Sequence, residues 1–287
     1  MRVSLRLVAS AFYRFGYKLH HKLFLRPQPR LRTPVIIVGS YLAGGAGKTP
    51  FTIWLAKHIQ KQNKRVAVLC HKVAWDEFIL LKNQLPNIKV IATSNRYTTA
   101  KAIQDQFDII ICDDGFEDSR FTGAKRICLN WHEQPTSWTR LFPNGPFRSL
   151  KQDHDEREII HLNCYGTNNI IPDVNFAIET LTNYTPGKPL SAKIICGLGN
   201  PNRFIEDVRA FGAHHGIVIQ GSIIRPDHDK HFSQIIANEL SYNDVIISQK
   251  DASRLQQEFL VHPKLHIAIQ NVSVSDNAIK NINSLLS

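Results

Sequence analysis

The sequence predicts an α/β protein: a P-loop NTPase-like core with a mainly parallel sheet, a smaller C-terminal α/β domain and an N-terminal amphipathic helix. Three observations support this prediction. Short β-branched runs alternate with helical stretches through most of the 287 residues. One run leads through a glycine-rich turn into a helix, in "VGSYLAGGAGKTPFTIWLA" (38–56). The turn-rich segment "TNYTPGKPL" (182–190) interrupts the alternation. We therefore expect three parts, residues 1–32, 33–185 and 186–287.

The N-terminal segment, residues 1–26, has the pattern of a basic amphipathic helix. Its apolar side chains recur at steps of three and four residues, with arginines and lysines between them. The apolar positions are Leu5, Val8, Phe12, Phe15, Leu19 and Leu23. This pattern is typical of a helix that lies in a membrane interface. The alternative is a helix packed on the protein's own core, with a solvated basic face. Pro27, Pro29 and Pro34 prevent its continuation.

The core segment is expected to alternate strands and helices. Strands are predicted at 35–38, 65–70, 88–92, 107–112, 126–130 and 158–162, and helices at 50–62 and 98–106. The run "FDIIIC" (107–112) has the continuous apolar character of a strand buried on both faces.

The alternation resumes after residues 182–190. Strands are predicted at 192–196, 216–219, 244–248 and 266–269, and helices at 201–211, 231–240 and 251–259. This second run of elements predicts the C-terminal α/β subdomain.

The overall composition is that of an ordinary globular protein, with 43% hydrophobic residues. No apolar run approaches the roughly 18 residues needed to span a bilayer, and no segment has the order of a secretory signal. The five cysteines are scattered without a CxxC pair. This cysteine pattern argues against a disulfide framework or a zinc site and fits a reducing cytosol.

The charge distribution is uneven. The net charge is +11, and residues 1–75 contain fourteen Lys and Arg but no acid before Asp76, so the other 212 residues sum to −3. A block of cations at one end indicates a polyanionic partner, either nucleic acid or an anionic membrane surface. The cations alternate with leucines and phenylalanines and lack base-reading or stacking motifs, so lipid is favoured over nucleic acid.

The glycine-rich turn predicts a phosphate-binding loop. Its small residues let backbone N–H groups converge on an anion, and the following helix adds its positive end. Lys48 would reach the β- and γ-phosphates of a nucleotide, and Thr49 would hold Mg²⁺. Leu42 stands where the strict pattern has its first glycine. The alternative is a strand–helix turn with a chance Lys-Thr. The predicted nucleotide-binding residues are Gly44, Gly45, Ala46, Gly47, Lys48, Thr49 and Pro50.

A second chemistry-bearing stretch is "FDIIICDDGFED" (107–118). A buried strand that ends in two acids is the Walker-B arrangement, whose carboxylates bind Mg²⁺ directly or through water. Asp113 and Asp114 are therefore the predicted metal ligands beside Thr49. Paired acids after a strand also occur as plain turn residues.

Taken in order, the motifs identify a family resemblance along nearly the whole chain. After the basic helix come "VGSYLAGGAGKTP", "DDGFED", "LFPNGPFRSL", "CGLGNPNRF", "RPDHDKHF" and "IISQKDASRL". This series resembles the tetraacyldisaccharide 4′-kinase family of lipid A biosynthesis. That family's loop likewise lacks the first consensus glycine, so Leu42 does not argue against the site.

The resemblance implies a reaction and a location. The γ-phosphate of ATP, with Mg²⁺ as cofactor, would move to the 4′-hydroxyl of an acylated glucosamine disaccharide 1-phosphate, giving lipid IVA. The protein would be peripheral on the cytoplasmic face of the inner membrane. Apart from the resemblance, we expect a monomer that binds an anionic membrane surface and not nucleic acid.

The resemblance also implies catalytic residues. The family has an acid after its second strand, and "WDEF" (75–78) matches it at Asp76, without the flanking glycine and proline. The family pairs this acid with a histidine, for which His228 is the match and His231 the alternative. Asp76, His228 and Lys48 are thus the predicted catalytic residues.

Two further residues are predicted to bind substrate. Arg148 matches the family's arginine and would clamp a phosphate bidentately. Asn200 lies in a strand-to-helix turn of the C-terminal part. For Arg148 the alternative is a surface arginine, and for Asn200 it is a purely structural turn.

Four departures from the family pattern concern activity more than fold. The Ser-Arg-Gly-Tyr signature and the glycine-rich stretch after the second strand are replaced by the short "VAVLCHKVAWDEF" (66–78). The Gln-His after Asp-Asp-Gly-Phe is Glu117-Asp118, and the Glu after the clamp arginine is Ser149. The adjacent histidines are split as His228 and His231. A working kinase with an altered acceptor site is favoured over a copy that binds nucleotide but transfers phosphate poorly.

A nucleotide-dependent switch protein, such as a metallochaperone-like GTPase, is the alternative from another class. Such a GTPase would carry an Asn-Lys-x-Asp motif for base recognition, and the nearest string here is "SQKD" (248–251). The match is poor, because Ser248 replaces the asparagine. A comparison of ATP and GTP binding separates the two classes.

Overall fold

The computed structural model describes residues 5–131, 137–154, 159–165, 171–227 and 229–286, and it divides the chain into two compact units. Unit 1 comprises Met1–Asn175 and Val274–Ser287, and unit 2 comprises Phe176–Ser273. The predicted boundary at 185/186 lies within unit 2. The last residues of the chain belong to unit 1.

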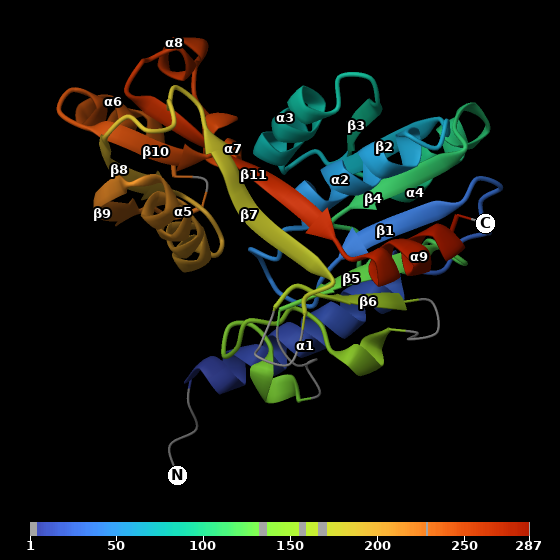
Figure 1. Ribbon diagram of the computed structural model, residues 1–287. Coiled ribbons are helices and arrows are strands. Elements are labelled where there is room, and N and C mark those ends of the chain that lie inside the picture. Colours follow the sequence, from blue (N-terminus) through green and yellow to red (C-terminus); the bar gives the residue numbers. More distant parts are fainter. Residues whose placement is uncertain (1–4, 132–136, 155–158, 166–170, 228, 287) are drawn as a thin grey trace. The chain divides into compact units, whose positions relative to one another are not determined.

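Unit 1 is built on a six-stranded sheet with the order β3-β2-β4-β1-β5-β6 (Figure 1). Its strands are β1 Val35–Gly39, β2 Val66–His71, β3 Lys89–Thr93, β4 Ile109–Asp113, β5 Lys125–Asn130 and β6 Ile159–Asn163. Every neighbouring pair is parallel. The central strands β1 and β4 are buried along their whole length, as their continuous apolar runs predict. All six strands therefore end at the same edge.

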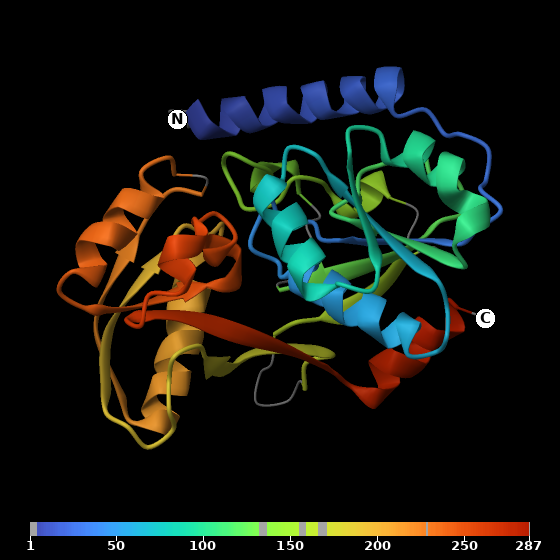
Figure 2. The same cartoon turned by 90° about the horizontal axis from the view of Figure 1, so that it is seen from above.

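Helices cover both faces of this sheet. They are α2 Lys48–Gln60, α3 Trp75–Gln84, α4 Arg96–Ile103 and α9 Asp276–Ser284, with short 3-10 turns η1 Gln104–Gln106, η2 Trp138–Arg140 and η3 Lys151–Asp153. Figure 2 shows α2 and α9 on one side of the sheet and α4 on the other. Tyr97 and Ala100 of α4 complete a buried cluster with alternate residues of β1, β2 and β4.

The N-terminal helix α1, Leu5–Phe24, contacts unit 1 through its small and polar residues. The Ser10 hydroxyl is fully buried and donates to the Leu141 carbonyl at 2.9 Å, and the Tyr13 hydroxyl donates to the Arg148 carbonyl at 2.9 Å. The predicted apolar stripe faces away, with Leu5, Phe12 and Phe15 exposed by 84%, 72% and 68%. Among the described residues, no helix has the length and apolarity required to cross a bilayer.

Unit 2 is a five-stranded sheet with the order β7-β11-β10-β8-β9. Its elements are β7 Val174–Leu181, β8 Leu190–Cys196, α5 Pro201–His215, β9 Ile217–Ile224, α6 Phe232–Leu240, β10 Asp244–Ser248, α7 Gln249–Ala252, α8 Gln257–Leu260 and β11 Leu265–Val274. Strands β9, β8, β10 and β11 run parallel. Ile194 and Ile195 point to opposite faces, one into a cluster with α5 and the other into a cluster with α6.

The predicted α/β fold class is confirmed, with one helix prediction wrong and three elements unpredicted. The single helix predicted at 251–259 is replaced by α7 and α8, which residues 253–256 separate. The arginine in this break, Arg254, turns its side chain back to the Gly197 carbonyl. Helices α3 and α9 and strand β7 were not predicted. Glu158, the predicted first residue of the sixth strand, lies outside the described residues.

Candidate active site

The first half of the glycine-rich loop is fixed by packing against the core of unit 1. Leu42 is buried at 9% exposure among Tyr41, Phe116 and Phe147. It also forms an isolated antiparallel bridge with Phe147. Its side chain therefore fills space that a glycine would leave empty, which explains why the consensus glycine is absent.

The end of β1 requires a glycine for a different reason. A Cβ at Gly39 would lie 2.2 Å from the Cβ of Phe116, in the stretch "DDGFED". Because this distance is far below van der Waals contact, only glycine lets the two motifs approach so closely. The loop and the acidic stretch are thus packed directly against each other.

The second half of the loop has the backbone conformation of an anion cradle. Gly45 and Gly47 have positive φ angles of 70° and 75°, a region that favours glycine. Trp131 donates its indole N–H to the Ala46 carbonyl at 2.9 Å. Helix α2 begins at Lys48, directly after Gly47, and runs to Gln60. The positive end of this 13-residue helix is therefore added to the loop.

The Asp113 carboxylate lies at the end of β4 and contacts the first turns of α2. It accepts from the Thr49 hydroxyl at 2.9 Å and from the Thr52 hydroxyl at 2.8 Å. Asp113 is 1% exposed, and burial followed by the charge of Glu77 raises the pKa of this carboxyl. A buried carboxylate beside a threonine hydroxyl is a donor set that fits Mg²⁺, which uses one or two protein carboxylates together with substrate phosphates.

Asp114 follows with a left-handed backbone, at φ 52°. Its Oδ1 lies 3.4 Å from Lys48 Nζ and also accepts from Arg148 Nη2. Burial opposes ionisation of Asp114, but the charges of Lys48 and Arg148 outweigh it and lower its pKa. The predicted metal ligands are therefore divided: Thr49 and Asp113 contact each other, whereas Asp114 contacts two cations.

Arg148 lies in a segment that is hydrogen-bonded to the loop. Its backbone N–H donates to the Tyr41 carbonyl at 2.8 Å, and the Ala43 N–H donates to the Pro146 carbonyl at 2.9 Å. Its side chain is only 18% exposed, so the alternative of a surface arginine does not describe it. Tyr13 of α1 binds the Arg148 carbonyl, so α1, Arg148 and the loop form one connected structure.

Glu117 holds the other side of the same guanidinium. Its Oε1 lies 2.8 Å from Arg148 Nε and accepts from the Ser149 hydroxyl at 3.3 Å. Ser149 is in turn 3.1 Å from His154 Nε2. Burial raises the pKa of the Glu117 carboxyl, and the charge of Arg148 opposes this shift. The site thus combines two cations, Lys48 and Arg148, with two carboxylates that pair with them.

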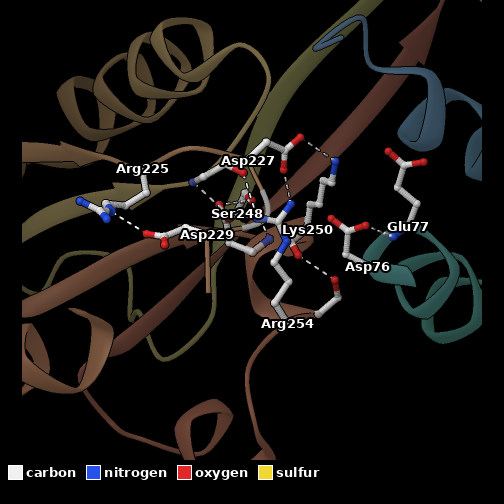
Figure 3. Close-up of polar contacts among 11 residues, drawn as sticks. Asp76, Glu77, Arg225, Asp227, Asp229, Ser248, Lys250 and Arg254 are labelled. Atoms are coloured by element: carbon white, nitrogen blue, oxygen red, sulfur yellow. Dashed lines mark hydrogen bonds and ion pairs between the residues drawn. The ribbon is translucent and has the colours of Figure 1, made fainter. Parts of the chain in front are cut away.

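The predicted base, Asp76, lies in the first turn of α3 and is 3% exposed. Its Oδ1 accepts from the Glu77 N–H at 2.9 Å, as Figure 3 shows. Helix α3 packs against α2. The charge of Glu77 helps to raise the pKa of Asp113. Both acids of "WDEF" belong to unit 1, as the loop does.

The remaining predicted residues belong to unit 2. Asn200 caps α5, because its Oδ1 accepts from the Arg203 N–H at 3.4 Å. His228 lies outside the described residues. His231 is exposed at the start of α6, with its Nδ1 3.2 Å from Gln234 Oε1.

Unit 2 has its own network of charges after β8, β9 and β10 (Figure 3). Asp227 pairs with Lys250 at 3.5 Å and with Arg254. Asp251 is fully buried and accepts from the Gly197 N–H at 3.2 Å and from the Ser248 hydroxyl at 2.7 Å. The motifs "CGLGNPNRF" and "SQKDASRL" are therefore joined by these bonds.

Sequence reasoning did not identify Arg96 of α4. Its Nη2 donates to the Asp113 carbonyl at 2.9 Å and to the Asp114 carbonyl at 3.0 Å. Arg96 thereby supports the backbone of both acids from the α4 side of the sheet. Nothing local to "SNRYTT" indicates this role, because the contact joins residues far apart in the sequence.

Comparisons with known proteins are consistent with these features. A family profile described as tetraacyldisaccharide-1-P 4′-kinase matches residues 2–71 and 70–286. Proteins named tetraacyldisaccharide 4′-kinase are similar: one from Chlamydia caviae at 26% identity, over 88% of this chain and 76% of the relative, and one from Haemophilus influenzae at 27%, over 83% and 80%.

The fold also has a solved counterpart. It is described as the "apo" form of LpxK from Aquifex aeolicus in complex with ATP. The match covers 98% of each chain with a TM-score of 0.69 at 22% identity, which supports the fold.

Proposed function

Because the chain belongs to the tetraacyldisaccharide-1-P 4′-kinase family, we propose that it transfers the γ-phosphate of ATP to the 4′-hydroxyl of a tetraacylated glucosamine disaccharide 1-phosphate. The product is lipid IVA, and the reaction is a step of lipid A biosynthesis. One observation carries this proposal within the structure. Lys48 contacts Asp114 and Thr49 contacts Asp113 where the glycine-rich loop and the start of α2 meet the end of β4.

The nucleotide would lie on the loop. Phosphoryl transfer needs little covalent chemistry from the protein, so positioning and charge neutralisation dominate. Lys48 and the N–H groups of residues 44–49 would hold the triphosphate. Thr49 and Asp113 would hold Mg²⁺, whose charge offsets the charge of the transferred group. We assign Asp114 to the positioning of Lys48 and Arg148, which it contacts.

Asp76 would accept the proton of the sugar hydroxyl. Its burial at 3% exposure and its place in the same unit as the loop support this role. We propose His228 as the partner that orients it, on the family resemblance alone. Arg148 would bind a substrate phosphate, since a guanidinium offers several donors in one plane. Asn200 is proposed as a second contact to the acceptor.

The protein would work on the cytoplasmic face of the inner membrane, as a peripheral monomer. The exposed apolar stripe of α1 supports this location, because a large apolar patch on a surface helix indicates a lipid or protein contact. An apolar groove of about 490 Å³ adjoins the stripe, lined by Leu7, Val8, Ala11, Phe12, Phe15 and Trp138. The cations of α1 would attract anionic headgroups.

The transfer reaction is tested directly. Purified protein is incubated with γ-labelled ATP, Mg²⁺ and the disaccharide 1-phosphate in detergent, and the labelled lipid is identified. We expect label at the 4′ position. A matched acceptor without the 4′-hydroxyl should accept none. Hydrolysis of ATP or GTP without any labelled lipid would instead indicate a nucleotide switch.

The assignment of Asp76 is tested separately. Asp76→Asn should lower kcat by about 100-fold, which is in the usual range for loss of a general base. Glu179→Gln changes an exposed acid of β7 and should leave kcat unchanged. An unaltered rate for Asp76→Asn would rule out this base.

Membrane binding is tested by flotation with vesicles that contain anionic lipid. The variant Phe12→Asp/Phe15→Asp should float about tenfold less than the wild type, since two exposed apolar contacts are lost. Val261→Asp, at an exposed residue of unit 2, serves as the control. Binding to an oligonucleotide without binding to vesicles would contradict the proposal.

A further inference from the structure

Arg148 is held by carboxylates on two sides. Its Nη2 donates to Asp114, and its Nε lies 2.8 Å from Glu117 Oε1. The guanidinium is only 18% exposed, so it is not free to adopt other rotamers in solvent. Glu117 therefore forms an ion pair on the Nε side of the guanidinium, whereas Nη2 makes the hydrogen bond to Asp114.

The charges around Arg148 balance. Lys48 and Arg148 are the cations, and Asp114 and Glu117 are the anions that contact them. Without the Glu117 charge, Arg148 would keep only Asp114, which also contacts Lys48. Among the ion pairs of the described residues, Asp114 would then be the one counter-charge for both cations. The buried Nε atom of Arg148 has no hydrogen-bond partner in the part of the chain that the structure describes, so it would also lose the carboxylate that compensates its charge.

Two departures from the family pattern meet at this point. The family has glutamine where this chain has Glu117, and glutamate where it has Ser149. In the structure the Ser149 hydroxyl donates to Glu117 at 3.3 Å, so the two altered side chains touch each other. Each pattern therefore has one carboxylate at these two positions, at residue 117 in this chain and at position 149 in the family pattern.

We propose that Glu117 is a positioning residue for phosphoryl transfer: it holds the Nε edge of Arg148 and supplies the carboxylate that the family pattern carries at position 149. This inference rests on the proposed kinase function and deepens it. The two departures are then one compensated exchange, which preserves the clamp arginine in its working orientation. Glu117 acts through Arg148 and needs no contact with substrate.

The first experiment is a double-mutant cycle on kcat, with KM for ATP measured on the same variants. Glu117→Gln keeps the side-chain shape and removes the charge. It should lower kcat about 10- to 100-fold, as misplacement of a clamp by about 1 Å does, with less than threefold change in KM for ATP. In a background of Arg148→Ala, Glu117→Gln should change kcat by less than about twofold, because the two residues act as a unit. Glu179→Gln is the control.

The second experiment is a rescue. Glu117→Gln/Ser149→Glu restores the family arrangement and should recover kcat to within about threefold of the wild type, whereas each single variant stays low. Should the glutamate fail to fit at the buried position 149, Ser149→Asp provides the smaller carboxylate. A kcat for Glu117→Gln equal to the wild type, or independent effects of Glu117→Gln and Arg148→Ala, would overturn the inference.

Thermal unfolding separates this inference from the proposed function. Arg148→Ala leaves Glu117 without its cation, whereas Asp114 keeps its contact with Lys48, so adding Glu117→Gln to it should raise Tm. If the wild type transfers no phosphate but Glu117→Gln raises the Tm of Arg148→Ala, the kinase proposal fails and the Glu117–Arg148 coupling stands. If the wild type is an active kinase and Glu117→Gln has full activity, the inference alone fails.

Discussion

Asp113 of unit 1 and Asp251 of unit 2 are similar by position and differ in their partners. Both are almost fully buried carboxylates: Asp113 is the last residue of β4, and Asp251 lies in α7, the short helix that follows β10. Both accept from a hydroxyl, at 2.9 and 2.8 Å for Asp113 and 2.7 Å for Asp251. Asp251 also binds a backbone N–H and lies 3.5 Å from Arg254.

This difference in partners supports our proposal that Asp113, and not Asp251, takes part in the reaction. Asp251 joins two motifs of unit 2 through the Gly197 N–H and the Arg254 cation, so its charge has partners within the fold itself. Among the described residues, the Asp113 carboxylate accepts only hydroxyl hydrogen bonds and forms no ion pair with a cation. Burial raises the pKa of both carboxyls, so the difference between them lies in their partners. A buried carboxylate that lacks a compensating cation is costly for the fold, and such costs are typical of functional sites.

Among the variants of unit 1, Lys48→Ala should lower kcat the most. Lys48→Ala removes the cation that would neutralise the transferred phosphoryl group, and we expect kcat to fall by about 10³-fold or more. The labelled-lipid assay measures this. Lys57→Ala, an exposed lysine of the same helix, should retain full activity. Transfer by Lys48→Ala at more than a tenth of the wild-type rate would contradict the account.

Asp113→Asn should separate activity from stability. We expect kcat to fall about 100-fold, because the carboxylate proposed to hold Mg²⁺ is lost. Tm should stay within about 2 °C of the wild type or rise, because a buried charge is removed. Activity and circular dichroism melts are measured on the same preparation. A Tm loss of many degrees would mean that Asp113 is a structural residue like Asp251.

Asp251→Ala should give the opposite result. It leaves the buried Gly197 N–H without its acceptor and removes the carboxylate 3.5 Å from Arg254, at a cost of about 3 kcal/mol or more in the free energy of unfolding. The Tm should fall by several degrees. Asp105→Ala breaks an exposed ion pair with Arg32 and should cost less than about 1 kcal/mol. Equal melting temperatures for Asp251→Ala and Asp105→Ala would contradict a structural role for Asp251.

The smallest effect on stability is expected for Asp207 on α5, a further carboxylate of unit 2. Burial raises its pKa to about 6, against the opposing charge of Arg203, so the folded state binds its proton more tightly than the unfolded state does. Stability from this group is therefore lost as pH rises from about 4 to 6. Asp207→Asn should raise Tm by about 1–3 °C at pH 7.5 and by less at pH 4. A larger gain at pH 4 would contradict this sign.

Local signals in the sequence were sufficient to predict the loop, the acidic pair and the fold class. Glycines and a Lys-Thr after a strand, or two acids after "FDIIIC", are contiguous patterns with a direct physical meaning. Helix α3 was not predicted because "WDEFILLKNQ" buries a polar residue, Asp76, together with Leu80 and Leu81, and so lacks an amphipathic period. Helix α9 is mostly polar, and its start depends on the Ser275 cap.

The contacts that assemble the site could not be predicted in this way. Arg96 supports the backbone of Asp113 and Asp114 from another helix, and Arg148 joins Asp114 to Glu117 from a segment some 30 residues away. The sequence marks Glu117 and Ser149 only as two separate departures. Their contact, which makes them a pair, depends on how the chain folds.

The most direct test of the central claim is a crystal structure with a non-hydrolysable ATP analogue and Mg²⁺. The account predicts the β- and γ-phosphates on the N–H groups of residues 44–49, Lys48 against the γ-phosphate, and the metal beside Thr49 and Asp113. A fully occupied analogue bound elsewhere, with this loop empty or collapsed, would contradict it.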